Sequence, residues 1–293
     1  MKRLIVNADD LGWSQAVTRG IVQAHREGLL TSTTVMANLP GAAEALALAR
    51  QEAPDLAVGI HLNLTEGKPL APAAEVAPLL DAEGNLRRSL ATLLREARRS
   101  EAVRRAAARE FEAQVAWARD QGLTPSHLDS HKHVHVHPAI LPLVVDLARR
   151  HGVRAVRTTA EIRLPHLYHL LPDEWGVKQH VRQWLAGRLA ARWGTAARQA
   201  VRRAGLATTD WFFGVRATGG VSAWLFLYLL QYAPDGTGEL MVHPGLRDAD
   251  DRRPTRLAES RPNELAAVCD PQVRAAAEAH GWTWATYGDL DHD

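Results

Sequence analysis

The feature that most limits the folds open to this chain is an alternation of short apolar runs with longer helical segments. Apolar runs lie at residues 4–6, 32–36 and 58–60. Between them, residues 15–29 carry apolar side chains at helical spacing, and residues 42–53 are rich in alanine. Strands separated by helices of this length predict parallel strands joined by crossover connections. We therefore expect an α/β fold built on a parallel barrel.

The alternation continues toward the C-terminus with one interruption. Residues 101–121 have the pattern of an amphipathic helix, and further strands are expected at 126–129, 153–156, 240–242 and 281–287. A length of 293 residues is ordinary for a single α/β barrel, and no break in composition marks a second domain. We expect one domain over residues 1–293, in which residues 160–236 form a mixed insert or cap.

Acidic and imidazole side chains follow several of these strands at the point where each strand ends. The set is Asp9, Asp10, His61, His127, Asp129, His131 and His243. The carboxyl ends of parallel barrel strands all meet at one rim, which is where such folds build their active sites. The sequence therefore predicts a cluster of carboxylates and imidazoles at one mouth of the barrel.

Five of the fourteen histidines fall between residues 127 and 137, in the run HLDSHKHVHVHP. Extended backbone would place His127, Asp129 and His131 on one face. Neutral imidazole is a ready ligand for Zn²⁺, Co²⁺ or Ni²⁺, and one carboxylate with two imidazoles leaves coordination positions open for water. His133 and His135 are expected near the site, and His137 at the surface. The alternative, a linear histidine tract that only captures metal, would not explain the other strand-end residues.

Asp9 and Asp10 are adjacent, so we expect their side chains to point different ways. One carboxylate can then bind a metal while its neighbour acts as a general base toward a water; the alternative is a pair that caps a helix. His243 lies in the turn His-Pro-Gly and could protonate a leaving group from the opposite face. The alternative role for His243 is structural: a turn histidine hydrogen-bonded to the backbone.

Composition removes several other classes of protein. Thirty-five Lys and Arg against 33 Asp and Glu give a net charge of +2, so nucleic acid is not the expected partner. The single Cys269 excludes a disulfide framework within the chain and any four-cysteine zinc site. Asp9 and Asp10 interrupt the N-terminal apolar run too early for a signal peptide, so a cytoplasmic location is expected. The longest apolar stretch, residues 221–230, is too short to span a bilayer.

Residues 177–207 contain Lys178 and six arginines but no acidic residue. With Trp184 and Trp193 they predict an amphipathic helix that covers an edge of the barrel. Contact with a second copy in a homodimer, with substrate or with a membrane surface remains an alternative.

Four motifs carry a resemblance to a known family: NADDLG at 7–12, GIHLNLT at 59–65, HLDSHKHVHVHP at 127–138 and HPG at 243–245. In this order they resemble the YdjC/ChbG family of carbohydrate deacetylases, and Arg261 begins a stretch similar to the family's Arg-x-x-Glu-Leu. The resemblance implies a deformed (β/α), TIM-like barrel of the type shared by glycoside hydrolases and deacetylases. It implies a metal held by Asp10, His61 and His131, with Asp9 as the base.

Our own inference adds His243 as the catalytic acid. Substrate contacts are expected from His127, Asp129, His133, His135 and Arg261. The cofactor is expected to be one divalent metal ion: Mg²⁺, Zn²⁺, Co²⁺ or Ni²⁺.

The function expected from the resemblance is removal of an N-acetyl group from an acetylated amino sugar such as a chito-oligosaccharide, giving acetate and a free amine. Because residues 160–236 match no family pattern, a lipid-linked amino sugar of the hopanoid type, reached by peripheral membrane contact, is an alternative substrate. A metal-dependent phosphoesterase and a non-catalytic sugar- or metal-binding protein are further alternatives. The phosphoesterase is disfavoured because no Gly-rich or Arg/Lys-rich phosphate loop adjoins the motifs.

Overall fold

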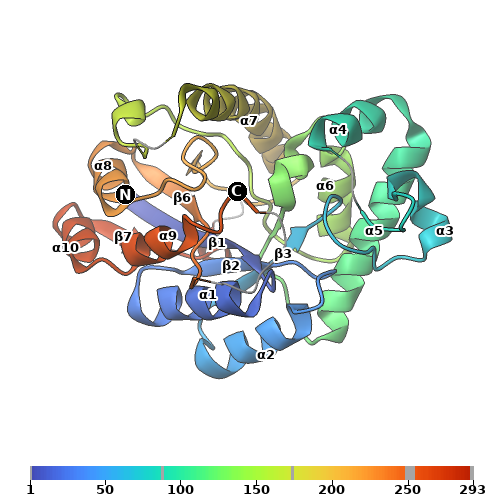
Figure 1. Cartoon of the computed structure of the whole chain (residues 1–293), viewed down its shortest axis with the longest axis horizontal. Helices are drawn as coiled ribbons and strands as arrows, with labels where there is room; N and C mark the ends of the chain where they lie inside the picture. Colours follow the sequence, from blue (N-terminus) through green and yellow to red (C-terminus); the bar gives the residue numbers. More distant parts are fainter. Residues whose placement is uncertain (1, 87–88, 173–174, 248–254, 291–293) are drawn as a thin grey trace.

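The computed structural model describes residues 2–86, 89–172, 175–247 and 255–290 (Figure 1). The strands are β1 (Lys2–Leu11), β2 (Ser32–Val35), β3 (Ala57–Leu62), β4 (Leu128–Ser130), β5 (Trp211–Phe213), β6 (Gly236–Val242) and β7 (Trp282–Trp284). The α-helices are α1 (Gln15–Glu27), α2 (Ala42–Glu52), α3 (Ala73–Val76), α4 (Leu90–Arg99), α5 (Glu101–Asp120), α6 (Leu141–Arg150), α7 (Val177–Arg203), α8 (Ala223–Tyr232), α9 (Arg261–Val268) and α10 (Pro271–Ala279). A 3₁₀ segment, η2 (His131–Val136), follows β4.

All strand pairs in the described residues are parallel, in the order β4-β3-β2-β1-β6-β5, and β7 pairs with the first residues of β1. Single bridges join the two edges of this curled sheet: Leu128 pairs with Val156 of the segment 155–161, and Glu161 pairs with Phe212 of β5. The sheet therefore closes as a deformed barrel, which confirms the expected fold class.

One expectation about an individual element needs correction. Residues 153–156, expected as a strand, pair only through isolated bridges at Ala155 and Val156. The segment 160–236, expected as a mixed insert or cap, contributes β5 to the sheet beside β6. It also supplies α8, and this helix includes most of the longest apolar stretch. In the described residues no helix is both long and apolar enough to cross a bilayer.

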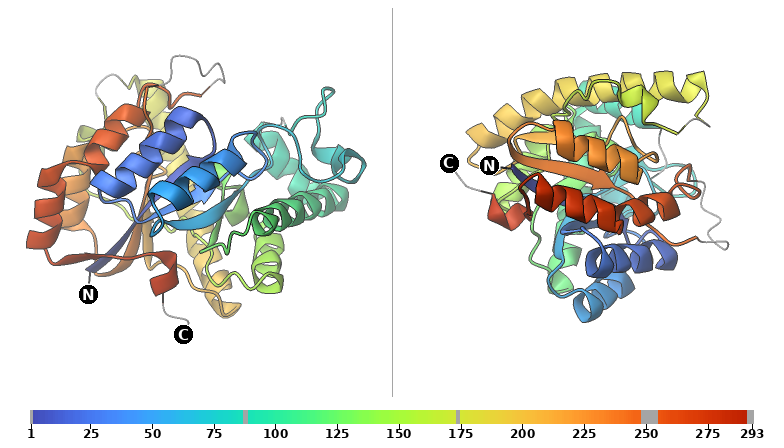
Figure 2. Two further views of the ribbon diagram at one scale, coloured as in Figure 1. Left: turned by 90° about the horizontal axis from the view of Figure 1, so that it is seen from below. Right: turned by 90° about the vertical axis from the view of Figure 1, so that its left-hand side faces the viewer.

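The helices surround the barrel, as the two further views also show (Figure 2). Helices α1 and α2 lie on the side opposite α7, and α3 to α6 form a separate group beyond β3 (Figure 1). Apolar side chains fill the layer between strands and helices in two large clusters. A small apolar cluster that includes Ile5, Ala155 and Tyr287 lies inside the barrel. Around Arg157 the interior is polar and fully buried.

The alternation of side chains along β1 explains how this strand serves both the core and the site. Leu4, Val6 and Ala8 belong to the outer apolar cluster, whereas Ile5 packs inside the barrel. Asp9 continues the inward series and contacts Arg157. The regular alternation then ends, because the pairing with β2 shifts register between Ala8 and Leu11.

Candidate metal centre and active site

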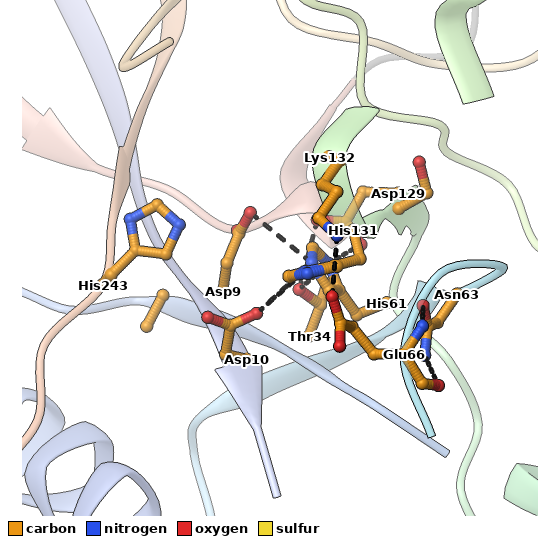
Figure 3. A network of polar contacts seen from close by, with 12 residues as sticks. Asp9, Asp10, Thr34, His61, Asn63, Glu66, Asp129, His131, Lys132 and His243 are labelled. Carbon is orange, nitrogen blue, oxygen red and sulfur yellow. Dashed lines mark hydrogen bonds and ion pairs between the residues drawn. The ribbon is translucent and has the colours of Figure 1, made fainter. Parts of the chain in front are cut away.

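The change of register in β1 brings two adjacent carboxylates to one place. Asp10 has a φ of 75°, in the left-handed region that Asp tolerates better than most residues. Its Oδ1 lies 3.7 Å from Nε2 of His61, and Oδ2 of Asp9 lies 3.8 Å from the same nitrogen. Figure 3 shows both carboxylates facing His61. The expectation that the adjacent side chains point different ways is therefore wrong, because the backbone turns at Asp10.

Asp10, His61 and His131 form a group that could hold a metal ion. Their ligand atoms all lie within 4.8 Å of one another, and Nδ1 of His131 is 3.3 Å from Oδ1 of Asp10. That oxygen is buried and has no well-formed hydrogen bond. The second oxygen of Asp10 accepts a hydrogen bond of 2.7 Å from Arg261. One carboxylate oxygen is thus held while the other is free, which fits a divalent cation between carboxylate and imidazoles.

Asp129 fixes the orientation of His61. The Nδ1 of His61 lies 2.7 Å from Oδ1 of Asp129, and the hydroxyl of Thr34 donates to Oδ2 of Asp129 at 3.1 Å. A proton on Nδ1 leaves Nε2 to face Asp10 as a ligand. Burial disfavours the imidazolium, but the carboxylates of Asp129 and Asp9 outweigh it and raise the pKa of His61 to about 9. A cation bound at Nε2 would displace the proton that the imidazolium carries on that nitrogen.

Arg157 is the functional residue that the sequence reasoning missed. It is fully buried, and its guanidinium donates to both oxygens of Asp9, at 2.7 and 2.9 Å. It also lies 2.5 Å from Asp129 and 2.6 Å from Glu239. Burial would raise the pKa of Asp9, but Arg157 and His61 hold it well below its ordinary value. Arg157 directly follows the run 153–156, so the strand-end rule that selected the other residues could have found it.

His243 lies across the two aspartates from His61 (Figure 3). Its backbone N–H donates to Glu264 at 2.6 Å, while its Nδ1 is 3.9 Å from the same oxygen and has no hydrogen-bond partner. Burial lowers the pKa of His243 to about 4, although Asp10 and Asp9 act in the opposite direction. The imidazole is therefore neutral at neutral pH in this arrangement, so it holds no excess proton before a reaction begins.

These groups form part of the wall of a cavity of about 830 Å³. Asp9, Asp10, His61, His131 and His243 all line it. Most of the remaining wall is apolar and comes from α4, α7 and the strand ends. Its apolar members are Trp13, Leu90, Ala91, Leu94, Val136, Ala186, Leu189, Ala190, Trp193, Val215, Met241 and Leu257.

Of the five residues expected to contact substrate, His133 lines this cavity. Its Nδ1 is buried without a partner, and its backbone is left-handed, as is that of Lys132. Lys132 pairs with Glu66 at 2.7 Å, and both also line the cavity.

The other four residues lie behind the cavity wall in the described structure. Asp129 binds His61, and Arg261 binds Asp10. His127 stacks on Tyr287 with ring centroids 3.7 Å apart, and His135 lies between Ser130 and the carbonyl of Arg157. His137, expected at the surface, is buried with its ring edge against Trp193.

Comparison with known proteins identifies the family of this chain. The sequence profile of the YdjC-like protein family matches residues 3–279. A carbohydrate deacetylase of Geobacillus stearothermophilus is 34% identical over 289 residues, which cover 98% of this chain and 97% of that protein. A carbohydrate deacetylase of Thermoanaerobacter pseudethanolicus is 30% identical over 85% of this chain and 83% of its own length.

Among solved structures, a protein of Enterococcus faecalis V583 for which cellobiose-phosphate cleavage has been suggested superposes with a TM-score of 0.74. It is 27% identical in sequence, and the match covers 98% of this chain and 97% of that one. Together with the motif resemblance, the profile match and the full-length relatives show that this chain belongs to the YdjC-like family.

Proposed function

We propose that the protein is a metal-dependent hydrolase that removes the N-acetyl group from an acetylated amino sugar. The observation that carries the proposal is the pairing of the Asp10, His61 and His131 group with a second carboxylate, Asp9, in the wall of one cavity. The names of the two long relatives support a carbohydrate as substrate.

The proposed metal ligands are Oδ1 of Asp10, Nε2 of His61 and Nδ1 of His131. When bound, a divalent cation would supply Lewis-acid chemistry, polarising the acetyl carbonyl and stabilising negative charge on its oxygen. Asp/His/His donors suit Zn²⁺, Co²⁺ or Ni²⁺, and Mg²⁺ if water completes most of its shell. Arg261 and Asp129 would keep the first two ligands in place from behind.

Asp9 is the proposed general base. Its carboxylate is ionised and lies beside the nitrogen of His61 that would bind the metal, so it is placed to take a proton from an attacking water. His243, on the other side, is the proposed donor to the departing amine. Because its imidazole starts neutral, the proton it gives must reach it during the reaction, and Asp9 is the nearby group that has just accepted one.

His133 is proposed to contact the sugar, since its free Nδ1 and its place in the cavity wall suit a hydroxyl or amide partner. His127, Asp129, His135 and Arg261, expected earlier to contact substrate, are proposed instead to position the groups that do. This assignment follows from their places behind the wall.

The apolar wall favours a second candidate within the same chemistry. A sugar alone presents mainly hydroxyl and amide groups, whereas α4 and α7 line this cavity with leucine, alanine and tryptophan side chains. An amino sugar attached to an apolar lipid would place its polar end near Asp9 and Asp10 and its apolar part along this wall. The reaction and its residues would be unchanged.

The experiment measures release of acetate from N-acetylglucosamine oligomers. The protein is first freed of metal with a chelator and is assayed before and after addition of Zn²⁺, Co²⁺, Ni²⁺ or Mg²⁺. We expect acetate only with added metal. Asp9→Asn should retain the metal but lose turnover by about 10²- to 10⁴-fold, the usual worth of a general base. His61→Ala should lose both. If the metal-loaded wild type binds sugar but releases no acetate from soluble or lipid-linked substrates, the deacetylase proposal fails.

A further inference from the structure

Helix α7 turns small residues toward the barrel and large apolar residues toward solvent, which is the reverse of an ordinary surface helix. Its buried face consists largely of small residues, among them Gly187, Ala190 and Gly194. A Cβ at Gly194 would lie only 2.1 Å from the carbonyl of Thr159, and one at Gly187 would lie 2.3 Å from Arg216. The helix therefore packs closely on the barrel through small residues along much of its length, and Trp193 and Val201 are the larger apolar residues that also contact the core.

Other large apolar side chains of α7 point outward instead. We call them the α7 ridge: Val177, Val181, Trp184, Leu185 and Leu189, which are 80%, 49%, 41%, 50% and 50% exposed. A surface helix normally turns such residues toward the core and polar residues toward water. Helix α7 runs along the outside of the molecule, on the side away from α1 and α2 (Figures 1 and 2). The ridge is thus an apolar surface exposed within the described structure.

The charge on this helix is of one sign. Within α7, Lys178 and six arginines are accompanied by no acidic residue. Arg198 donates to the carbonyl oxygen of Asp210, and Arg202 forms an ion pair with the Asp210 carboxylate at 2.7 Å, so these two cations at the far end are occupied. Arg188, beside the ridge, lies over the ring of Trp184 at 4.9 Å.

The cations near the ridge lie among further positive charge. Lys178, Arg182, Arg188 and Arg192 are exposed and form no ion pair with an acidic residue in the described structure. Arg256, which lines the cavity, is close enough to Arg182 that burial and this second positive charge both lower its pKa. An anionic partner would relieve this repulsion.

We propose that the α7 ridge docks on an anionic membrane surface. Apolar and aromatic side chains flanked by Lys and Arg are what an interfacial helix needs to bind acidic lipid headgroups. A second copy of this chain fits less well, because a two-fold contact through α7 would set these cations against identical cations. The charge of the helix therefore selects lipid over self-association.

The ridge is continuous with the candidate active site. Leu189 belongs to both the ridge and the cavity wall, and Ala186 and Trp193 on the same helix also line the cavity. Docking through the ridge would bring the cavity mouth against the lipid surface. If the deacetylase proposal holds, the substrate class would then be an amino sugar carried by a membrane lipid.

The test is co-sedimentation of the full chain with phosphatidylcholine vesicles, with and without phosphatidylglycerol. We expect binding only to vesicles that contain phosphatidylglycerol, and weaker binding as salt is raised. Trp184→Ser with Leu185→Ser should abolish binding. Arg188→Glu should weaken it about thirtyfold, since each basic residue near such a surface contributes roughly 1 kcal/mol and a reversal changes two charges. Arg203→Glu is the matched control in the last turn of α7 and should change binding much less.

Thermal unfolding and metal content show that each variant is folded. Acetate release from a soluble substrate should be the same in Trp184→Ser/Leu185→Ser as in the wild type, so failure of docking and failure of the deacetylase proposal are distinguishable. Absence of wild-type binding to phosphatidylglycerol vesicles at low salt overturns the docking proposal. So does equal binding by Arg188→Glu and Arg203→Glu, or a wild-type dimer that the ridge variant converts to a monomer.

Discussion

Arg157 and Asp9 lie 148 positions apart in the chain and meet through two hydrogen bonds of 2.7 and 2.9 Å, fully buried inside the barrel. The same guanidinium also forms ion pairs with Asp129 and Glu239. One guanidinium thus pairs with three buried carboxylates, and the proposed base is held in place by a group of opposite charge.

Replacing Arg157 should therefore affect stability before it affects chemistry. Arg157→Met would remove the guanidinium that pairs with three buried carboxylates, and we expect a loss of roughly 3–5 kcal/mol in the free energy of unfolding, measured by chemical denaturation. Arg105→Met is the control, because Arg105 forms an exposed pair with Glu101 that is worth at most about 1 kcal/mol. A fully stable Arg157→Met variant would contradict this account of the barrel interior.

Arg157→Lys separates charge from geometry. Lysine retains a positive charge but cannot bind both oxygens of Asp9 in a fork. We expect part of the stability to return while acetate release stays low. Steady-state kinetics on the metal-loaded variant would check this, and near-wild-type turnover would show that the fork is not required.

Metal affinity should depend on Asp129, although Asp129 is not a proposed ligand. Asp129→Asn would weaken the hold on the Nδ1 proton of His61, and loss of such a supporting carboxylate costs about 10- to 100-fold in metal affinity. Calorimetric titration of the chelated protein with Zn²⁺ measures the change. Glu239→Gln is the matched control, because it also removes a carboxylate from Arg157 but does not touch His61. Equal losses in both variants would show that charge balance, not the orientation of His61, sets the affinity.

The contribution of Glu161 to stability should fall as the pH rises from about 4.5 to about 7. Burial raises the pKa of Glu161 from 4.5 to about 7, and Arg216 offsets only part of this effect. Between these values the folded protein holds a proton that the unfolded chain has lost. The stabilisation is therefore complete below the unfolded value and disappears as the pH passes about 7.

Glu161→Gln should make this dependence shallower, so the variant should melt at a higher temperature than the wild type at about pH 8. It should not remove the dependence, because burial also raises the pKa values of Glu239 and Glu264 to about 7. Melting curves at several pH values measure the slope, with the exposed Glu101→Gln as control. An unchanged slope in Glu161→Gln would show that its carboxyl does not titrate in this range.

The close packing of α7 can be tested without touching the ridge. Gly194→Ala would force the helix away from the carbonyl of Thr159, and overpacking of this kind costs roughly 1–3 kcal/mol. Gly176→Ala, just before the same helix, has open space around the new methyl group and should be neutral. Denaturation of both variants checks the difference. Equal stability would mean that α7 does not rest on the barrel as described.

The strand-end rule predicted much of the site from the sequence, because polar residues at the ends of parallel strands must share one rim. It brought together Asp9, Asp10, His61, His131 and His243, which all line the cavity. It did not separate residues that face the cavity from residues behind it. Asp129 and His131 are two positions apart, yet one binds His61 from below and the other reaches the cavity. How far a side chain lies below the rim depends on where its strand ends in the folded barrel. A local sequence pattern does not contain this information.

Two other features depend on long-range packing. The orientation of α7 was beyond prediction, since its sequence alone does not say whether the small or the large face meets the barrel. A strand was expected at 153–156, but the continuation of this segment through 157–161 to the edge of β5 was not predicted, because single bridges leave no alternating pattern of the kind that marks a strand.

The left-handed turn at Asp10 limits where such a site can be built. On a regular strand, two consecutive aspartates would lie on opposite faces, and only one could meet His61. A designer who copied the five Asp and His side chains onto another barrel would therefore obtain an incomplete centre unless the irregularity in β1 was copied with them. The adjacent aspartates are a chemical pair only because the backbone between them is bent.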